Sequence, residues 1–422
     1  LPNPSVFNDM DAAADRLAAA IRGGERIAIW SDYDVDGATS AATLGRFLRD
    51  CGHDGYTIHI PDRITEGYGP NAEGLVALGA AGAGLVCLLD SGTVAFEPLE
   101  AAHAAGIEVV VIDHHAAEAE LPPATAVVNP NRPDQEPGHG HVCAAGMTFI
   151  LAVATNLRLR RAGYFDGRDG RPDAPPDLMR YLDLVALGTI CDVVPLTTLN
   201  RAFVTRGLAQ LSERRLPGVR ALADVATARE SITVADCGFG LGPRINAGGR
   251  IGDSGAGAAL LLETDPDAAR RQAETLGELN TERQTMEKDC TAQALAQVEG
   301  FVPGETRELA VAVVDAHEGI IGISAARVKE ALDAPAFVLA PTPEGTLKGS
   351  GRSVPGFDLG AAIIKARKQG LVLKGGGHAM AGGITIETDR LADFTAFMNA
   401  EIGDSDYAET GVVSRVDLEI PI

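Results

Sequence analysis

The first 200 residues alternate short apolar runs with amphipathic segments, a pattern that predicts strands separated by helices. The apolar runs lie at 26–30, 85–89 and 108–112, and amphipathic helices are expected at about 38–48 and 97–105. Strands of this length that alternate with helices indicate βαβ units, and therefore a parallel sheet with helices on both faces. The pattern predicts a doubly wound α/β first domain.

A different pattern follows in the second half of the chain. Residues 266–298 contain no proline after the first position and are rich in Ala, Glu, Gln and Arg, which predicts one long helix. Apolar strand-like runs restart at 308–314 and recur at 336–340 and 383–386. This part of the sequence predicts a second, smaller α/β or α+β domain.

Composition places the chain among multidomain globular proteins. It has 422 residues, of which 45% are hydrophobic and 22% charged. No apolar run approaches the roughly 20 residues of a membrane span, and the start at Leu1 has no signal-like core. The six cysteines form no CxxC pair and are expected to be buried free thiols. We therefore expect a cytoplasmic protein without membrane contact.

The net charge of −22 argues against a generally basic surface for nucleic acids. Any such site must be local, and residues 345–378 are the candidate because their only acid is Asp358. The basic residues there are Lys348, Arg352, Lys365, Arg367, Lys368 and Lys374. For 365–368 alone, a solvated helix face is the favoured interpretation.

Three aspartates follow the first apolar run at alternate positions, Asp32, Asp34 and Asp36. In an extended backbone their side chains point the same way, and only cations make such a concentration of charge tolerable. Gly37 is expected to release the chain into a helix. The spacing also opens an EF-hand loop, but the twelfth position, where that loop requires glutamate, is Thr43. We interpret the segment as a metal-binding motif.

Further acids and imidazoles follow other apolar runs, at Asp90, at Asp113-His114-His115 and at Asp192. In parallel sheets ligands bind at the carboxyl ends of the strands, so these side chains are expected at one edge. Carboxylates with one or two imidazoles suit Mn²⁺ or Mg²⁺. Two such ions about 3.5–4 Å apart promote displacement at phosphorus, which predicts phosphoester hydrolysis.

Glycine-rich segments with arginine, serine or histidine are the candidates for phosphate contacts. They lie at 240–250, 349–353 and 375–383, and 61–69 adds an arginine and a tyrosine. Glycines let backbone amides approach an anion, and arginine supplies a forked donor. A tight turn is the alternative interpretation for each segment alone. Together they favour a phosphate-bearing substrate between the domains.

These motifs resemble the DHH phosphoesterase superfamily, and within it the RecJ single-strand-specific 5′→3′ exonucleases. The resemblance rests on the following ordered motifs: Asp32-x-Asp34-x-Asp36-Gly37, Asp90, Asp113-His114-His115, Asp192, Leu241 to Ala247, Asn280-x-x-Arg283, Gly351-Arg352-Ser353 and Gly376-Gly377-His378. One departure is Trp30, which stands where the family often has histidine and leaves the second metal's ligands open.

The resemblance implies roles for individual residues. The implied metal ligands are Asp34, Asp36, Asp90, His114 and Asp192. The implied catalytic residues are Asp32, His115 and His378. The implied substrate-binding residues are Arg63, Arg244, Asn246, Ser350, Arg352 and Ser353. The implied cofactor is Mn²⁺ or Mg²⁺, with two ions.

The resemblance also implies domains and a function. The domains are a DHH catalytic domain at 1–263, a connecting helix at 264–300, a DHHA1 substrate-binding domain at 301–405 and the start of a truncated OB-type domain at 406–422. The function is hydrolysis of single-stranded DNA to mononucleotides, by a monomer, in DNA repair and recombination. A single-strand-binding protein and a helicase are the expected protein partners.

Two other functions remain open from the sequence. One is a DHH-type nanoRNase or cyclic-dinucleotide phosphodiesterase, which predicts faster turnover of very short substrates. The other is a non-catalytic nucleic-acid-binding scaffold, which the presence of all the implied metal ligands argues against.

Overall fold

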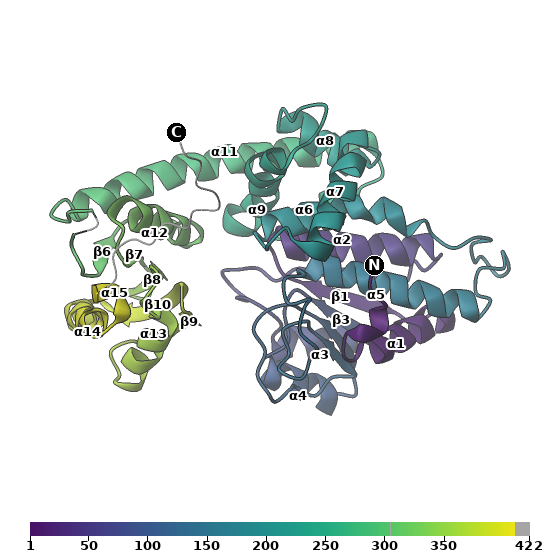
Figure 1. Ribbon diagram of the computed structural model, residues 1–422, viewed down its shortest axis with the longest axis horizontal. Coiled ribbons are helices and arrows are strands. Elements are labelled where there is room, and N and C mark those ends of the chain that lie inside the picture. Colours follow the sequence, from purple (N-terminus) through teal and green to yellow (C-terminus); the bar gives the residue numbers. More distant parts are fainter. Residues whose placement is uncertain (304, 410–422) are drawn as a thin grey trace, which may run out of the picture. The chain divides into compact units, whose positions relative to one another are not determined.

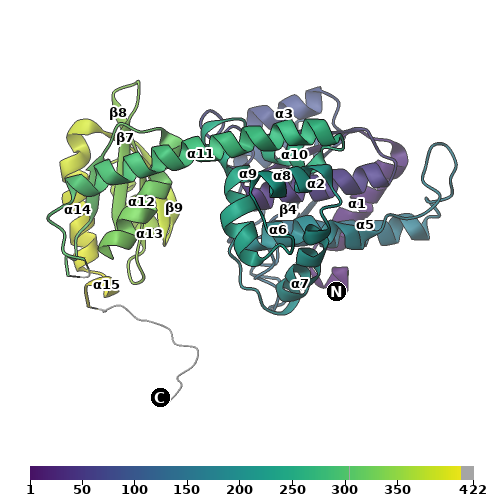
Figure 2. The ribbon, with the colours of Figure 1, turned by 90° about the horizontal axis from the view of Figure 1, so that it is seen from above.

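The structure is a computed structural model that describes residues 1–303 and 305–409. It contains two compact units, Leu1–Asn280 and a second unit from Thr281 onward. The boundary falls inside α11 (Pro266–Gln297), which Figure 2 shows as one continuous helix. The predicted long helix is confirmed.

The first unit is built around a five-stranded parallel sheet with the order β2-β1-β3-β4-β5. Its strands are β1 (Ile27–Ser31), β2 (Tyr56–His59), β3 (Leu85–Leu89), β4 (Glu108–Ile112) and β5 (Ala126–Val128). Both β1 and β3 are buried along their whole length, as expected for aliphatic strands covered on two faces. The predicted doubly wound α/β fold is confirmed.

Helices cover both faces of this sheet (Figure 1). On one face lie α1 (Met10–Gly23), α2 (Val35–Asp50) and α5 (Ala144–Arg161), and on the other lie α3 (Ala72–Ala80) and α4 (Phe96–Ala104). Successive strand residues serve opposite faces, so Ile29 belongs to the first core and Trp30 to the second.

The rest of the first unit is helical. Its elements are η1 (Pro4–Val6), η2 (Leu178–Tyr181), α6 (Leu182–Cys191), α7 (Thr198–Glu213), α8 (Pro217–Val225), the π-helical turn η3 (Asp236–Leu241), α9 (Gly242–Ile251) and α10 (Ala256–Leu262). The helix α6 packs against α2, α5 and α7, and its residues from 182 to 190 are buried. The C-terminal end of α6 lies near the sheet edge, because Asp192 there is 3.7 Å from His114, which follows β4.

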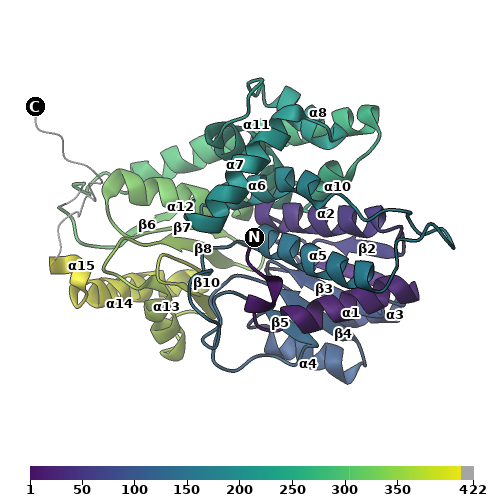
Figure 3. The same ribbon diagram turned by 45° about the vertical axis from the view of Figure 1, so that its right-hand side comes forward.

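The second unit has a mixed sheet with the order β6-β7-β8-β10-β9, in which β6 and β7 are parallel and the other neighbours antiparallel. Its strands are β6 (Ala310–Val313), β7 (Ala336–Pro341), β8 (Thr346–Arg352), β9 (Lys374–His378) and β10 (Ala381–Glu387). Its helices are α12 (Glu318–Leu332), α13 (Leu359–Lys368), α14 (Leu391–Gly403) and α15 (Asp406–Glu409), with the short turn η4 (Thr388–Arg390). In Figure 3, α12 lies on one side of this sheet and α13 and α14 lie on the other.

The alternative interpretation of the glycine-rich segments as tight turns is wrong for most of their residues. Residues 349–352 belong to β8, 375–378 to β9, and 242–250 to α9. The glycines permit close packing instead. A Cβ atom on Gly351 would lie 2.5 Å from the ring of Phe337, and one on Gly349 would lie 3.0 Å from Leu339. A larger side chain at either position would push β8 away from its neighbours.

The extended geometry predicted for the aspartate motif is also wrong beyond Asp34. The helix α2 begins at Val35, so Asp36 lies in its first turn and Asp34 is its N-cap. The first turn passes very close to Asp32, because a Cβ atom on Gly37 would lie 2.2 Å from the carbonyl oxygen of Asp32. Gly37 therefore permits the contact that folds the three aspartates together.

The described residues cover only part of what was predicted for the domains. The suggested OB-type domain lies mostly in residues 410–422, outside the described residues, and 406–409 form α15. The predicted limits of the domains remain predictions. Within the described part of the chain, no helix combines the length and apolar character needed to cross a membrane.

Candidate metal centre

Three neighbouring strands deliver polar side chains to one edge of the first sheet. Asp32 follows β1, Asp90 follows β3, and the segment Asp113-His114-His115 follows β4. These strands are parallel and adjacent, so their carboxyl ends meet. The structure therefore brings together the acids and imidazoles that the sequence pattern placed at strand ends.

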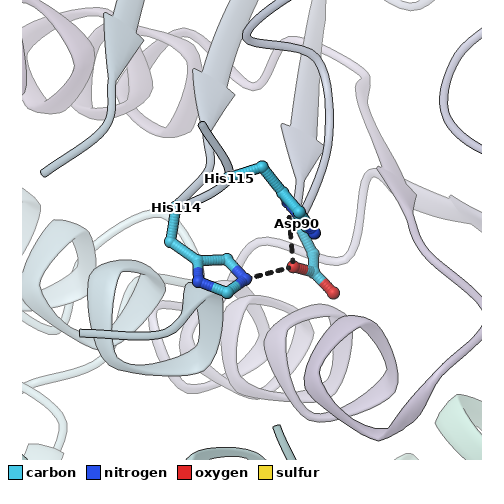
Figure 4. Close-up of side chains that lie close together, drawn as sticks. All are labelled: Asp90, His114 and His115. Atoms are coloured by element: carbon cyan, nitrogen blue, oxygen red, sulfur yellow. Dashed lines mark ion pairs between the residues drawn. The ribbon is translucent and has the colours of Figure 1, made fainter. Parts of the chain in front are cut away.

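His114 lies among three carboxylates. Its Nε2 atom is 3.2 Å from Oδ1 of Asp90 and 3.7 Å from Oδ2 of Asp36. Its Nδ1 atom is 3.7 Å from Oδ2 of Asp192, which caps the C-terminus of α6. Figure 4 shows both histidines beside the Asp90 carboxylate. One imidazole is thus within reach of acids from three separate elements.

Several polar atoms of this cluster are buried without satisfying their hydrogen bonds. Within the described part of the chain, Asp32 Oδ1, Asp90 Oδ1, His114 Nε2 and Asp192 Oδ2 have no hydrogen-bond partner. The short distance between His114 and Asp90 lacks the geometry of a hydrogen bond. Buried carboxylate oxygens without donors are costly unless a cation neutralises them. The donor set is mostly oxygen and fits Mn²⁺ or Mg²⁺.

The potential ligand atoms fall into three groups, each spanning no more than 4.8 Å. The groups are Asp32 with Asp34 and Asp90, Asp90 with His114 and His115, and Asp36 with Cys143 and Asp192. Asp90 belongs to two groups, so its carboxylate is placed to be shared by two neighbouring cations. Cys143, expected only as a buried free thiol, belongs to the third group.

Backbone amides fix two of the carboxylates. Asp36 accepts hydrogen bonds from the amides of Ala144 at 2.7 Å and Ala145 at 2.9 Å, the first two residues of α5. Asp34 accepts one from the amide of Gly37 at 3.0 Å. Helix N-termini favour negative charge, so both carboxylates are oriented without any cation.

Burial disfavours the ionised form of the remaining acids. It raises the pKa of Asp32 to about 8, and the nearby charge of Asp34 adds to the effect. It also raises the pKa of Asp192 to about 8, with Asp36 adding to it, and the pKa of Asp90 well above its ordinary value. These carboxylates ionise together only where positive charge is supplied.

Asp113 orients His115. Its Oδ1 atom lies 2.8 Å from Nδ1 of His115 and accepts hydrogen bonds from the amides of His114 at 2.7 Å and His115 at 3.2 Å. Burial alone lowers the pKa of His115, but the hydrogen bond and charge of Asp113 outweigh it and raise the pKa to about 9. A buried carboxylate therefore directs the His115 ring and favours its charged form.

We expect Asp113→Asn to lower the rate of the predicted phosphoester hydrolysis about 10- to 100-fold, because loss of a residue that orients a site histidine typically has an effect of this size. Without the carboxylate, the pKa of His115 falls and the alkaline limb of the pH–rate profile moves to lower pH. The measurement is the pH dependence of kcat/KM alongside the affinity for Mn²⁺. A uniform loss of activity with an unchanged pH profile would contradict the orienting role.

The other predicted residues of the first unit lie around the aspartate motif or on α9. The guanidinium of Arg63 lies 5.2 Å from the ring centre of Tyr33, and its charge acts on Asp32. Arg244 donates to the carbonyl of Gly240 at 2.7 Å, and Asn246 is half-buried on α9. Of these residues, Arg63 is the one whose positive charge acts on the acidic cluster.

The predicted residues of the second unit lie on its sheet. Alternation along β8 puts Ser350 and Arg352 on the face that carries α12, and Arg352 donates to the Ser350 hydroxyl at 3.0 Å. His378 is exposed at the end of β9. Ser353 is buried, and its hydroxyl donates to the carbonyl of Phe357 at 2.7 Å, so it stabilises the following turn.

Sequence reasoning missed three residues that support the histidines. Asn131 donates to the carbonyl of His114 at 2.5 Å, and Asn129 donates to that of His115 at 2.9 Å. Tyr68, noted only as an aromatic, places its hydroxyl 3.3 Å from the His115 ring nitrogens. Both asparagines follow β5, so recognition of that three-residue strand would have placed them at the same sheet edge.

Comparison with known proteins agrees with this geometry. The DHH family, N-terminal domain, matches residues 26–189, and the DHHA1 domain matches residues 307–404. The single-stranded-DNA-specific exonuclease RecJ of Salmonella typhimurium is 38% identical over 398 residues, which cover 92% of this chain and 68% of that protein. The chain belongs to the RecJ family.

Solved structures support membership of the RecJ family. A structure of exonuclease RecJ bound to manganese matches 96% of this chain and 95% of its own, with a TM-score of 0.79 and 33% identity. RecJ from Thermus thermophilus in complex with Mn²⁺ matches with a TM-score of 0.79 and 31% identity, over 96% of this chain and 55% of that one. This RecJ-family chain therefore spans about half of the Thermus chain.

Proposed function

We propose that this protein is a metal-dependent exonuclease that hydrolyses single-stranded DNA to mononucleotides in the 5′→3′ direction. The observation that carries the proposal is the set of buried, unpartnered carboxylate and imidazole atoms at one sheet edge. Membership of the RecJ family supports the choice of substrate. A role in DNA repair and recombination in the cytoplasm, with a single-strand-binding protein and a helicase as partners, belongs to the same proposal.

The proposed ligands of two divalent cations, Mn²⁺ or Mg²⁺, are Asp34, Asp36, Asp90, His114 and Asp192, with Asp32 beside them. Bound there, such cations lower the pKa of water and neutralise charge on a phosphodiester. The imidazole of His115, whose charged form Asp113 favours, lies beside the same carboxylates, where it can donate a hydrogen bond to a phosphate oxygen. Arg63 adds a second positive charge near Asp32.

The proposed contribution of the second unit is to bind substrate phosphates. Lys348, Ser350 and Arg352 occupy alternate positions on one face of β8, which forms a row of donors. Close packing supports this row, since a Cβ atom on Gly322 of α12 would lie 3.0 Å from the Ser350 hydroxyl. We propose His378, at the end of β9, as a further substrate contact.

Arg352→Ala is expected to raise KM for single-stranded DNA by about tenfold or more, because a charged hydrogen bond to phosphate is lost. The value of kcat should change less. Higher salt should reduce the difference in KM between the variant and the wild type, because salt weakens contacts with phosphate. Steady-state kinetics on an oligonucleotide gives both constants. Arg390→Ala is the matched control, since Arg390 is exposed and pairs with Asp393. Equal KM values for the two variants would contradict the assignment.

A single assay tests the proposed activity. Oligonucleotides of two to forty nucleotides, labelled at either the 5′ or the 3′ end, are incubated with Mn²⁺ or Mg²⁺. Progressive release of mononucleotides from the 5′ end of long single strands, with duplex untouched, is the expected result. Faster turnover of the shortest substrates would favour a nanoRNase instead. Degradation from the 3′ end would overturn the polarity.

A further inference from the structure

Two exposed apolar side chains stand out in the first unit. Val193 is 87% exposed and Phe239 is 85% exposed, the highest values for large apolar residues in the described part of the chain. Neither side chain contributes to a hydrophobic core. Exposed apolar side chains that serve no core are available for contact with a ligand.

Both residues sit on unusual backbone. Val193 has a φ of 59°, a left-handed conformation that a β-branched side chain rarely adopts. Phe239 lies in the π-helical turn η3, and such turns frequently occur at functional sites. Each conformation costs free energy, so the surrounding structure must hold it in place. The backbone thus gives a second reason, independent of exposure, to expect function at both positions.

Both residues are connected to the candidate metal centre through the end of α6. Val193 directly follows Asp192 in the chain. The turn η3 packs against Cys191, the residue before Asp192: the Cys191 thiol donates to the carbonyl of Cys237 at 3.6 Å, and a Cβ atom on Gly242 would lie 2.6 Å from the Cys191 sulfur. Phe239 therefore projects from a turn whose two ends rest on the neighbour of a proposed ligand.

The same turn holds a guanidinium through its main chain. Arg244 donates to the carbonyl of Gly240, the residue after Phe239, at 2.7 Å. An exposed aromatic side chain on a turn that also binds an arginine fits a nucleotide, which offers a base for stacking and a phosphate for a cation. A second copy of this chain is a less suitable occupant, because the patch is small and two molecules of charge −22 repel each other.

We propose that Phe239 is a stacking site for one unpaired nucleobase of the substrate. The inference rests on the proposed function and deepens it. Bases in a duplex are already stacked and paired, so this site favours single strands. Because every base has an aromatic face, stacking selects strandedness without selecting sequence.

The test compares an oligothymidylate with a strand of the same length whose nucleotides lack bases. Fluorescence anisotropy in EDTA measures binding without hydrolysis. The wild type is expected to bind the oligothymidylate about tenfold more tightly than the abasic strand, in keeping with one stacked base. Phe239→Ala should remove most of this preference, and Phe239→Trp should retain it.

Met179→Ala is the matched control. Met179 is 50% exposed and lies at the opposite end of α6 from Asp192. An unchanged base preference in Phe239→Ala would overturn the inference. So would a wild-type dimer that this variant converts to a monomer in sedimentation, since self-association would then explain the ring. A wild type that shows the base preference but degrades no strand would overturn the proposed function and leave the stacking site supported.

Discussion

His114→Ala should reduce hydrolysis of single-stranded DNA by at least about a thousandfold while leaving the fold intact. The His114 ring nitrogens lie within 4 Å of carboxylate oxygens of Asp36, Asp90 and Asp192. Without His114 the site loses its proposed imidazole ligand, so the affinity for Mn²⁺ should fall together with the rate of hydrolysis. Isothermal titration with Mn²⁺ and a nuclease assay measure the two effects on the same protein.

The matched control for this experiment is His103→Ala. His103 is exposed on α4, on the other face of the sheet from α2 and α5, and should tolerate the change with normal activity. Circular dichroism and thermal unfolding show whether each variant is folded. Near-normal hydrolysis by folded His114→Ala protein would contradict the proposed ligand set.

Without divalent cations, the protein should become less stable as the pH is raised from about 5 to 8. In the folded, metal-free state the pKa values of Asp32 and Asp192 are about 8, whereas in the unfolded chain both acids titrate near 4. Between these values the folded state binds more protons than the unfolded state, so a rise in pH favours unfolding. The melting temperature should fall by about 5 °C or more over this interval.

Saturating Mn²⁺ or Mg²⁺ should remove most of this dependence, because cations bind the folded state and stabilise the ionised carboxylates. Differential scanning calorimetry at several pH values, with EDTA or with metal, measures the effect. Asp32→Asn should flatten the metal-free curve, while Asp173→Asn, at an exposed loop position, should not. The same pH dependence with and without cations would contradict a metal site at these acids.

The sequence predicted the framework of the first unit because its longest strands are uninterrupted aliphatic runs. β3 and β4 fall on the residues expected, and β1 differs by one residue at each end. The strands β2 and β5 were missed since they are short and their flanking residues mask the pattern. β8 and β9 were missed for a different reason, because their many glycines locally indicate turns. Glycine is found in these strands because aromatic and aliphatic side chains pack directly against the backbone.

The site was predictable where ligands directly follow strands, as at Asp90 and His114. It was less predictable where tertiary packing decides, because nothing local shows that Cys143 approaches Asp36 or that Asn131 holds His114. Asp36 illustrates both situations. Its place in a metal motif was visible from spacing, but its position in the first turn of α2 and its anchoring by α5 were not.

Main-chain amides, and not side chains, hold the carboxylate of Asp36 in place. The donors are main-chain amides of two alanines, Ala144 and Ala145, so an alanine scan cannot remove them and a comparison of side chains does not reveal them. Ala144→Pro is the informative change, because the first turn of a helix accepts proline and the substitution removes the amide proton that Asp36 accepts. Part of this centre is thus encoded by where a helix starts rather than by which residues start it.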